Sequence, residues 1–204
     1  MQQSEVISIL KKELNFTDDS IKKLKNFVNL VLNENQKHNL ISKSTESQIW
    51  SRHILDSAQL VKFIDFSSDS LADLGTGAGF PGVVLDIFNK NKSFHVKLYE
   101  KSKLKRRFLK KVISELDLSA QVFGDVREHS LVSNIIVCRA FKKLDQVIQV
   151  SREIAKKPHK LMILKGQNAQ EEIKNSFKTK KYPYKLESSM TNKDSKIILM
   201  EINK

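Results

Sequence analysis

Residues 73–82, with the sequence DLGTGAGFPG, constrain the fold of this chain more than any other segment. They hold four of the chain's six glycines, and they separate the apolar run 71–74 from the apolar stretch 80–88. Glycine adopts positive φ easily and lets a ligand approach the backbone, and Pro81 suits the first turn of a helix. A glycine loop that joins a strand to a helix is typical of the place where α/β sheets bind nucleotides. The sequence therefore predicts an α/β domain with a ligand site at this loop.

The loop matches two nucleotide-binding patterns. Residues 77–82 fit the dinucleotide pattern G-x-G-x-x-G, and residues 73–79 fit the D-x-G-x-G-x-G pattern shared by methyltransferases. Glu100 follows at the predicted end of the next strand, where its carboxylate can accept hydrogen bonds from ribose hydroxyls. Asp73 favours the methyltransferase interpretation, because its carboxylate would repel a pyrophosphate. It can instead hold the loop or contact the cationic methionine part of S-adenosylmethionine.

Strands and helices alternate after residue 66, which predicts a mainly parallel sheet covered on both faces. We expect a Rossmann-like class I methyltransferase fold of α/β class, with a C-terminal antiparallel hairpin and an N-terminal helical segment. Residues 1–66 would form the helical segment packed on the core, and residues 67–204 the methyltransferase domain. The expected strands are 71–74, 95–100, 120–123, 134–139, 160–164, 184–190 and 197–202, and the expected helices between them are 80–88, 102–116, 143–156 and 169–177.

The first 64 residues contain neither glycine nor proline, which favours continuous helices with short joints. Asp18 or Asp19 is the expected N-cap of the second helix. Thr45 and Gln48 resemble a capping box that opens a third helix running to about Val61.

The charge of the chain favours a polyanionic partner. It has 36 Lys and Arg against 23 Asp and Glu, a formal net charge of +13, and a pI near 9.7. Such a field attracts nucleic acid, although a generally lysine-rich composition would give the same excess.

Cys138 is the single cysteine, so an intramolecular disulfide and a multi-cysteine zinc site are excluded. No apolar stretch is long enough for a membrane span and the start does not resemble a signal peptide, so we expect a cytoplasmic protein.

Five short blocks occur in the order seen in one known family. They are HNLIS at 38–42, RHILDS at 52–57, GFPG at 79–82, RAF at 139–141 and LKG at 164–166. In these blocks the chain resembles the bacterial small-subunit ribosomal RNA guanine-N7 methyltransferases, over about residues 39–166. The resemblance implies S-adenosyl-L-methionine as the cofactor, and N7 of a guanine in 16S ribosomal RNA, free or in the small subunit, as the target.

The resemblance also implies positions for cofactor-binding residues. Gly75 and Phe80 would line the site, Gly77 would shape the loop, and Val126 and Arg127 would contact the adenine region. Asp125 stands where the family usually has another residue, and its carboxylate can meet the adenine amino group instead. Together with Arg139, which would lie beside both cofactor and substrate, the expected cofactor-binding set is Asp73, Gly75, Gly77, Phe80, Glu100, Asp125, Val126, Arg127 and Arg139.

The expected substrate-RNA contacts are Arg52, His53, Arg139 and Lys165. Arg139 and Lys165 end neighbouring strands at the ligand crevice, where Arg139 can bind guanine O6 or a phosphate and Lys165 a phosphate. The alternative for each is a salt bridge at the sheet edge. Arg52, His53 and Asp56 share a helix face, as an intrahelical ion pair or as contacts to RNA or cofactor. A cationic run with no acid is either a solvated helix face or an RNA surface: Lys101, Lys103, Lys105, Arg106, Arg107, Lys110 and Lys111.

The chemistry needs no proton-transfer residue. Guanine N7 carries an in-plane lone pair and no proton, so alignment of the reacting atoms is the main requirement. We therefore assign no catalytic residue and no metal, since His53 lacks a second ligand at metal-binding spacing. We expect a monomer.

Other interpretations of the function remain open: a non-catalytic RNA-binding factor on this fold, a methyltransferase for another substrate, or a nicotinamide dehydrogenase. A cytosine-C5 methyltransferase is disfavoured because Val137, not proline or threonine, precedes Cys138.

Overall fold

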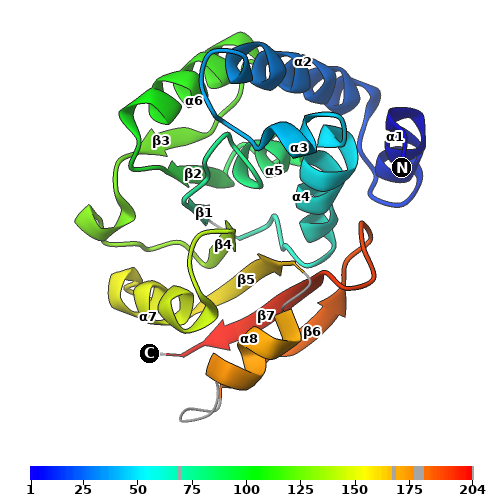
Figure 1. The fold of residues 1–204 in the computed structure, drawn as a ribbon. Helices are drawn as coiled ribbons and strands as arrows, with labels where there is room; N and C mark the ends of the chain where they lie inside the picture. Colours follow the sequence, from blue (N-terminus) through cyan, green and yellow to red (C-terminus); the bar gives the residue numbers. More distant parts are fainter. Residues whose placement is uncertain (69, 167–168, 177–181, 204) are drawn as a thin grey trace.

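A seven-stranded sheet forms the centre of the protein (Figure 1). The computed structural model describes residues 1–68, 70–166, 169–176 and 182–203. Within these residues the strand order is β3-β2-β1-β4-β5-β7-β6. The strands from β1 to β5 pair in parallel, whereas β7 pairs antiparallel with both β5 and β6. The bounds are β1 Ser70–Leu74, β2 His95–Tyr99, β3 Gln121–Phe123, β4 Ile135–Arg139, β5 His159–Lys165, β6 Lys185–Ser188 and β7 Lys196–Ile202.

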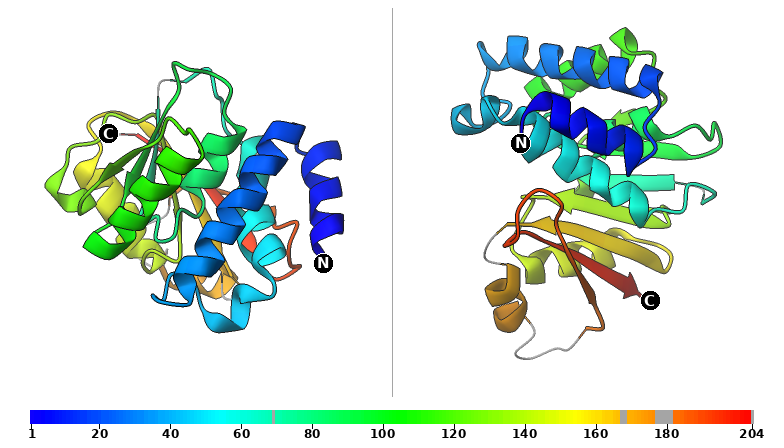
Figure 2. Two further views of the ribbon diagram at one scale, coloured as in Figure 1. Left: turned by 90° about the horizontal axis from the view of Figure 1, so that it is seen from above. Right: turned by 90° about the vertical axis from the view of Figure 1, so that its right-hand side faces the viewer.

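Helices cover both faces of this sheet (Figure 2). Side chains alternate along each strand, so Ile135 and Val137 of β4 belong to one core cluster and Ile136 and Cys138 to the other. The first cluster is covered by the N-terminal helices with α5 and α6, and the second by α7 and α8. The helices of the α/β region are α5 Gly82–Phe88, α6 Lys103–Glu115, the 3₁₀ turn η3 Val126–Glu128, α7 Leu144–Ile154 and α8 Ala169–Ser176.

The predicted class is confirmed: a mainly parallel sheet, an antiparallel C-terminal hairpin and N-terminal helices. The predicted strands and helices agree with the observed ones to within two residues at each end; residue 177 of the last predicted helix lies outside the described residues. Buried side chains of the N-terminal helices and of α5 and α6 form one cluster. The division of the chain at residue 66 stays a prediction. No helix in the described part of the chain has the length and apolar character needed to cross a membrane.

The N-terminal segment begins with α1 Gln3–Lys12 and α2 Asp18–Asn35. The expected N-cap of α2 was wrong by one residue. The hydroxyl of Thr17 caps the helix by accepting a hydrogen bond from Ser20 N at 3.2 Å. Asp18 and Asp19 instead lie in the first turn, where the helix dipole favours negative charge.

The predicted third helix is not continuous. The chain forms α3 Lys43–Glu46, a π-helical turn η1 Trp50–Leu55, α4 Asp56–Ala58 and a 3₁₀ turn η2 Gln59–Lys62. The capping box at Thr45 was therefore wrong: Thr45 lies inside α3, and its hydroxyl donates back to Ser42 O at 2.8 Å. A π-helical turn widens the helix and is frequent at functional sites. Here it includes Arg52 and His53.

The sheet order places the glycine loop where the chain reverses direction across the sheet. β1 lies between β2 and β4, and the loop after β1 and the loop after β4 leave toward opposite faces. In open α/β sheets, ligands bind in the crevice at the carboxyl ends of such strands. Arg139 ends β4 beside Leu164 of β5, so it lies at this same edge.

Candidate active site

The glycine loop forms the floor of the site and is pinned to the neighbouring strand. The carbonyl of Tyr99, at the end of β2, accepts hydrogen bonds from Gly75 N at 2.9 Å and Thr76 N at 3.1 Å. Gly77 has a φ of 60°, and a Cβ built on it would meet no heavy atom nearer than Gly75 O at 3.9 Å. The backbone at Gly77 is thus open, as close approach of a ligand requires.

Asp73 holds this loop from below. It is fully buried, and its Oδ2 accepts a hydrogen bond from Gly82 N at 2.7 Å. Burial is the main cause that raises the pKa of Asp73 to about 6. Asp73 lines neither of the two cavities described below, so a direct contact with a methionine group is not open to it. The geometry agrees with the loop-holding alternative.

Gly82 is required by close packing at the start of α5. A Cβ at this position would overlap Leu98 Cδ2 of β2 and lie 2.8 Å from Asp73 Oδ2. Only glycine lets α5 approach the sheet this closely. The third glycine of nucleotide-binding loops has this same role.

Glu100 lies in contact with the glycine loop, and its predicted contact with ribose hydroxyls stays a prediction. It is buried, and its Oε2 accepts from Gly77 N at 3.1 Å while Oε1 accepts from Ser102 N at 2.7 Å. A carboxylate has about four lone-pair positions, so these two bonds leave acceptor capacity for hydroxyl groups. Glu100 helps to line a cavity of about 290 Å³, the smaller cavity, whose wall is formed by Gly75, Tyr99, Glu100, Lys101, Lys105, Asp125, Val126, Arg127, Ala140, Phe141 and Lys142.

The turn after β3 closes the smaller cavity. Asp125 caps η3, since its Oδ1 accepts from Arg127 N at 3.1 Å. Val126 is buried and supplies an apolar wall, whereas Arg127 is exposed. The three residues that the sequence placed at the adenine region therefore line the same cavity as Glu100.

A larger cavity of about 540 Å³ adjoins the smaller one. The two share Gly75, Lys105 and Ala140 in their walls. Six parts of the chain contribute: the N-terminal segment, the glycine loop, the ends of β4 and β5, the loop between β6 and β7, and single residues of α6 and α8. The lining residues are Leu40, Ile41, Thr45, Arg52, His53, Asp56, Gly75, Thr76, Gly77, Ala78, Phe80, Lys105, Arg139, Ala140, Leu164, Lys165, Gly166, Glu172, Thr191 and Ser195.

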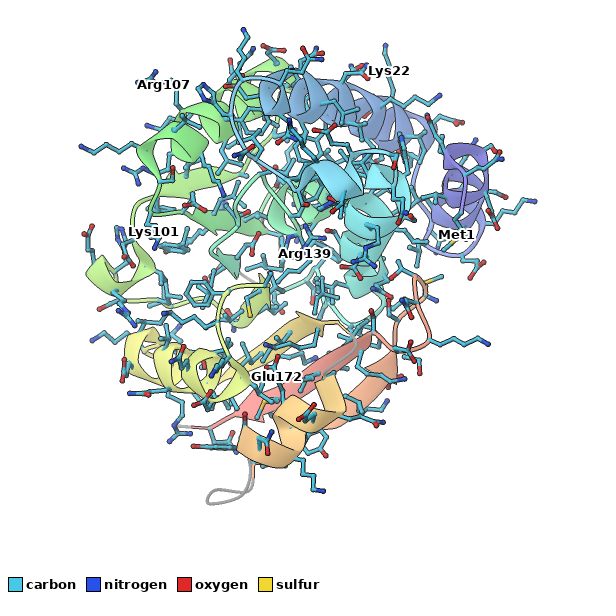
Figure 3. All side chains as sticks on the ribbon, in the orientation of Figure 1. Met1, Lys22, Lys101, Arg107, Arg139 and Glu172 are labelled. Carbon is cyan, nitrogen blue, oxygen red and sulfur yellow. The ribbon has the colours of Figure 1, made fainter. Side chains whose placement is uncertain are left out.

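Arg139 lies between the sheet and the N-terminal segment (Figure 3). Its Nη1 donates to Arg52 O at 2.8 Å, and its Nη2 lies 2.8 Å from His53 Nδ1. The guanidinium also lies 3.5 Å from Asp56 Oδ2. It stacks over the ring of Phe80, 5.2 Å from the ring centre, and the His53 ring contacts the same phenyl group at 5.0 Å. Arg139 is thus held on several sides.

These contacts replace the intrahelical ion pair considered for Arg52 and Asp56. Asp56 pairs with Arg139 of β4, and Arg52 takes part through its backbone carbonyl. The Arg52 side chain is exposed at the larger cavity and makes no ion pair within the described residues. His53 is buried, and burial together with the nearby Arg139 and Arg52 lowers its pKa to about 3.

Lys165 forms the salt bridge that was the alternative to a phosphate contact. Its Nζ lies 2.6 Å from Glu172 Oε2 of α8 and donates to Lys142 O at 3.0 Å. Its side chain is only 10% exposed. Lys165 borders the larger cavity, but its ammonium group is already neutralised; phosphate binding by Lys165 stays a prediction.

The cationic run on α6 divides into different environments. Arg106 Nη1 donates to the carbonyls of Glu100 and Lys101 at 2.9 and 2.7 Å, and Lys111 pairs with Glu115 at 3.7 Å. Lys105 lines both cavities, which the sequence pattern did not single out. The remaining cations of the run are exposed, and in Figure 3 Arg107 lies at the outer surface by α6.

Two other residues that line the larger cavity could not be recognised from the sequence as site residues. Thr45 looked like a helix cap, and Thr191 lies in the loop between β6 and β7. Cys138 is buried, and burial raises the pKa of its thiol to about 12. A thiol in that environment is not a nucleophile at neutral pH, which argues further against cytosine-C5 chemistry.

Comparisons with known proteins identify the family. The family described as GidB, rRNA small subunit methyltransferase G, matches residues 20–198. Ribosomal RNA small subunit methyltransferase G of Pelagibacter ubique is 33% identical over 184 residues, covering 87% of this chain and 85% of its own. The protein of the same name from Orientia tsutsugamushi is 33% identical over 200 residues, covering 97% and 98%.

Solved structures agree on the fold. A methyltransferase from Pyrococcus furiosus superposes with a TM-score of 0.57 at 9% identity, covering 72% of this chain and 81% of its own. A SAM-dependent methyltransferase from Aquifex aeolicus gives a TM-score of 0.56 at 12% identity, covering 73% and 90%. On the strength of the family match over most of its length, the chain belongs to the rRNA small subunit methyltransferase G family.

Proposed function

We propose that this protein transfers a methyl group from S-adenosyl-L-methionine to N7 of a guanine in small-subunit ribosomal RNA. The observation that carries the proposal is the family match to residues 20–198, a range that includes every residue lining the two cavities. Relatives named ribosomal RNA small subunit methyltransferase G cover nearly the whole chain, which supports the same substrate class.

The residues of the smaller cavity fit the nucleoside part of the cofactor. Glu100 has free lone pairs for ribose hydroxyls, and Asp125 offers a carboxylate for the adenine amino group. Val126 supplies an apolar surface and Arg127 borders the opening. Gly75 lines both cavities, and Gly77 leaves its backbone uncovered at the larger one, where the methionine part would lie.

The bound cofactor supplies an electrophilic methyl group, and the larger cavity is the place for guanine. N7 attacks with its own lone pair, so the residues around it have to orient the base rather than remove a proton. Arg139 is the residue best placed to do this, because it can donate hydrogen bonds to guanine O6 and leave N7 free. Phe80, under the guanidinium, helps to fix its plane.

The RNA is held outside the cavity by charge. The net charge of +13 favours a polyanion, Arg52 and Lys105 line the larger cavity, and further cations of α6 are exposed to solvent. Our proposal includes a monomer that acts in the cytoplasm without a metal ion. RNA contacts of Arg52 and Lys165 belong to the proposal as well, whereas the role of His53 is argued separately below.

Labelled methyl transfer tests this proposal directly. Purified protein would be incubated with methyl-labelled S-adenosylmethionine and either small subunits or naked small-subunit RNA from a strain lacking the enzyme. We expect label in the RNA, at a guanine that becomes sensitive to borohydride reduction and aniline cleavage. A Gly77→Val variant, whose side chain would occupy the open loop, is the matched negative control.

Two results would contradict the proposal. Cofactor binding without methyl transfer to either RNA substrate would point to another methyl acceptor. Failure to bind S-adenosylmethionine in calorimetry, with retained RNA binding, would favour a non-catalytic RNA-binding factor.

A further inference from the structure

Arg139 depends on the N-terminal segment for its orientation. Its hydrogen-bond acceptors are Arg52 O, His53 Nδ1 and Asp56 Oδ2, which lie more than 80 residues away in the sequence. A guanidinium has five N–H donors. The contacts with described residues use three of them, so two remain for a ligand in the cavity that Arg139 lines.

The contact between Arg139 and His53 fixes the protonation of the imidazole. A guanidinium can only donate hydrogen bonds, so His53 Nδ1 has to present a lone pair to Arg139 Nη2 at 2.8 Å. In neutral histidine the proton then sits on Nε2. Nε2 lies 2.9 Å from the hydroxyl of Thr45, which it can reach as a donor.

Thr45 completes this chain of hydrogen bonds. Its hydroxyl hydrogen is directed to Ser42 O at 2.8 Å, so its oxygen is free to accept from His53. The chain therefore runs in one direction, from Arg139 through His53 and Thr45 to the backbone at Ser42. If the hydrogen bonds ran the other way, a protonated His53 Nδ1 would face the N–H donor of Arg139 Nη2.

A charged His53 would not fit this arrangement. The ring is buried against Phe80, and its cationic neighbours are Arg139 and Arg52. Each of these favours the neutral form, and the pKa is lowered to about 3. The surroundings of His53 thus maintain a neutral acceptor next to a permanent cation.

Asp56 links the same unit to the C-terminal hairpin. Its Oδ1 accepts from Gln59 Nε2 at 3.0 Å, and Gln59 Oε1 accepts from Met190 N at 2.8 Å. Thr191, next in the chain, lines the larger cavity. The turn that holds Arg139 therefore also holds the loop between β6 and β7 at the cavity wall.

We propose that His53 is a positioning residue for Arg139: neutral, protonated on Nε2 and anchored by Thr45, it orients the guanidinium toward the O6 edge of the target guanine. His53 then has no direct contact with RNA, in contrast to the sequence-based expectation. The choice of O6 as the ligand of Arg139 rests on the function proposed above. The orientation itself rests only on the contacts of this chain.

Substitutions at His53 separate positioning from packing. In His53→Leu the acceptor is lost while an apolar side chain remains against Phe80. We expect kcat on small subunits to fall about 10- to 100-fold, as for loss of a hydrogen bond to a charged group. Affinity for S-adenosylmethionine should stay within about threefold of wild type, because His53 lines only the larger cavity. In His53→Asn the amide oxygen can replace Nδ1, so activity should recover to within about fivefold of wild type.

Two controls keep the interpretation specific. His95→Leu makes the same change at an exposed histidine at the opposite end of the sheet, and should leave kcat unchanged. In a double-mutant cycle, His53→Leu should have little effect when Arg139 is already lysine, because the residue it positions is absent. Additive losses in that cycle would overturn the proposal. So would an unchanged kcat in His53→Leu, or equal losses in folded His53→Leu and His53→Asn.

Nitrogen NMR tests the orientation without any activity measurement. With ¹⁵N-labelled histidine, the signals missing in His53→Asn identify His53 among the chain's five histidines. We expect the neutral Nε2–H form at neutral pH. An imidazolium or an Nδ1–H form would overturn the proposal even in an active enzyme. If wild-type protein fails to methylate RNA but shows the Nε2–H form, the proposed function fails and the positioning of Arg139 stands.

Discussion

Gly82→Ala should destabilise the protein although alanine is the better helix former. The added Cβ would overlap Leu98 Cδ2 and lie 2.8 Å from Asp73 Oδ2, a distance that real Cβ atoms do not show. Both neighbours are fully buried, so neither can turn away into solvent. Either α5 moves away from the sheet or the carboxylate of Asp73 moves away from Gly82 N, its hydrogen-bond donor at 2.7 Å.

The expected loss follows from these contacts. Overpacking of a well-packed core costs about 1–3 kcal/mol. Weakening the hydrogen bond to a buried carboxylate adds about 1–2 kcal/mol. The higher helix propensity of alanine offsets at most about 1 kcal/mol. The free energy of unfolding should therefore fall by about 2–4 kcal/mol, and Tm by about 5–15 °C for a chain of this size.

Urea denaturation, followed by the fluorescence of the single, buried Trp50, measures this change. The assay should be run above the Asp73 pKa of about 6, so that the carboxylate is ionised in both proteins. Gly124→Ala is the matched control, because a Cβ there would meet only Glu128 Oε2 at an ordinary 3.5 Å. If Gly82→Ala loses no more stability than Gly124→Ala, the role assigned to Gly82 in packing and to Asp73 in holding the loop is refuted.

Three further predictions concern buried groups. Glu172→Gln should lower the free energy of unfolding by about 1–3 kcal/mol, because it leaves the largely buried Lys165 ammonium without its carboxylate at 2.6 Å. Cys138 should react with an aromatic disulfide at least about 100-fold more slowly in the native protein than in urea, because it is buried and its pKa is raised to about 12. Wild-type protein should lose stability relative to His53→Asn as the pH falls from about 6.5 toward 4, by up to about 1.4 kcal/mol per pH unit. The sign follows because the folded-state pKa of His53, about 3, lies below the ordinary histidine value of 6.5, so the unfolded chain binds the extra proton.

Each of these has a clear contrary outcome. Unchanged stability of Glu172→Gln would show that the ion pair adds nothing to folding. Fast labelling of Cys138 under native conditions would mean that the core around β4 opens readily. Parallel pH–stability curves for wild type and His53→Asn would show that His53 binds a proton in the folded state; comparing the two proteins cancels the opposite contribution of Asp73, whose pKa is raised.

The glycine loop and its partners could be predicted because their signals are local. A strand, the glycine loop, a helix and the acid at the end of the next strand follow one another directly in the sequence. The conformational preferences of glycine and proline then predict the turn between the first strand and the helix. Glu100 contacts Gly77 as expected, and Arg139 ends a strand at the same edge. The sheet class followed from alternation of short apolar runs with amphipathic stretches.

The N-terminal side of the site could not be predicted, because long-range contacts decide it. Apolar periodicity suggested a continuous helix from Thr45, yet the chain there changes from α to π to 3₁₀ geometry. The differences among these geometries lie in a few backbone hydrogen bonds, which sequence periodicity does not resolve. Likewise, the spacing of Arg52 and Asp56 suggested a local ion pair, but the partner of Asp56 is Arg139.

Arg139 lies where two parts of the site meet, one built from the sheet and one from the N-terminal segment. The side proposed to bind the cofactor is built from the β1 loop and its partner strand, which the shared methyltransferase fold already provides. The side proposed to bind the substrate is built from the N-terminal turn and the hairpin loop, which Asp56 and Gln59 connect. Because Arg139 extends from β4 and is held by the turn at His53, any shift of the turn relative to the sheet changes the direction of its free donors. Under the proposed function, orientation of the target base would therefore depend on the N-terminal segment, although that segment contains none of the glycine loop.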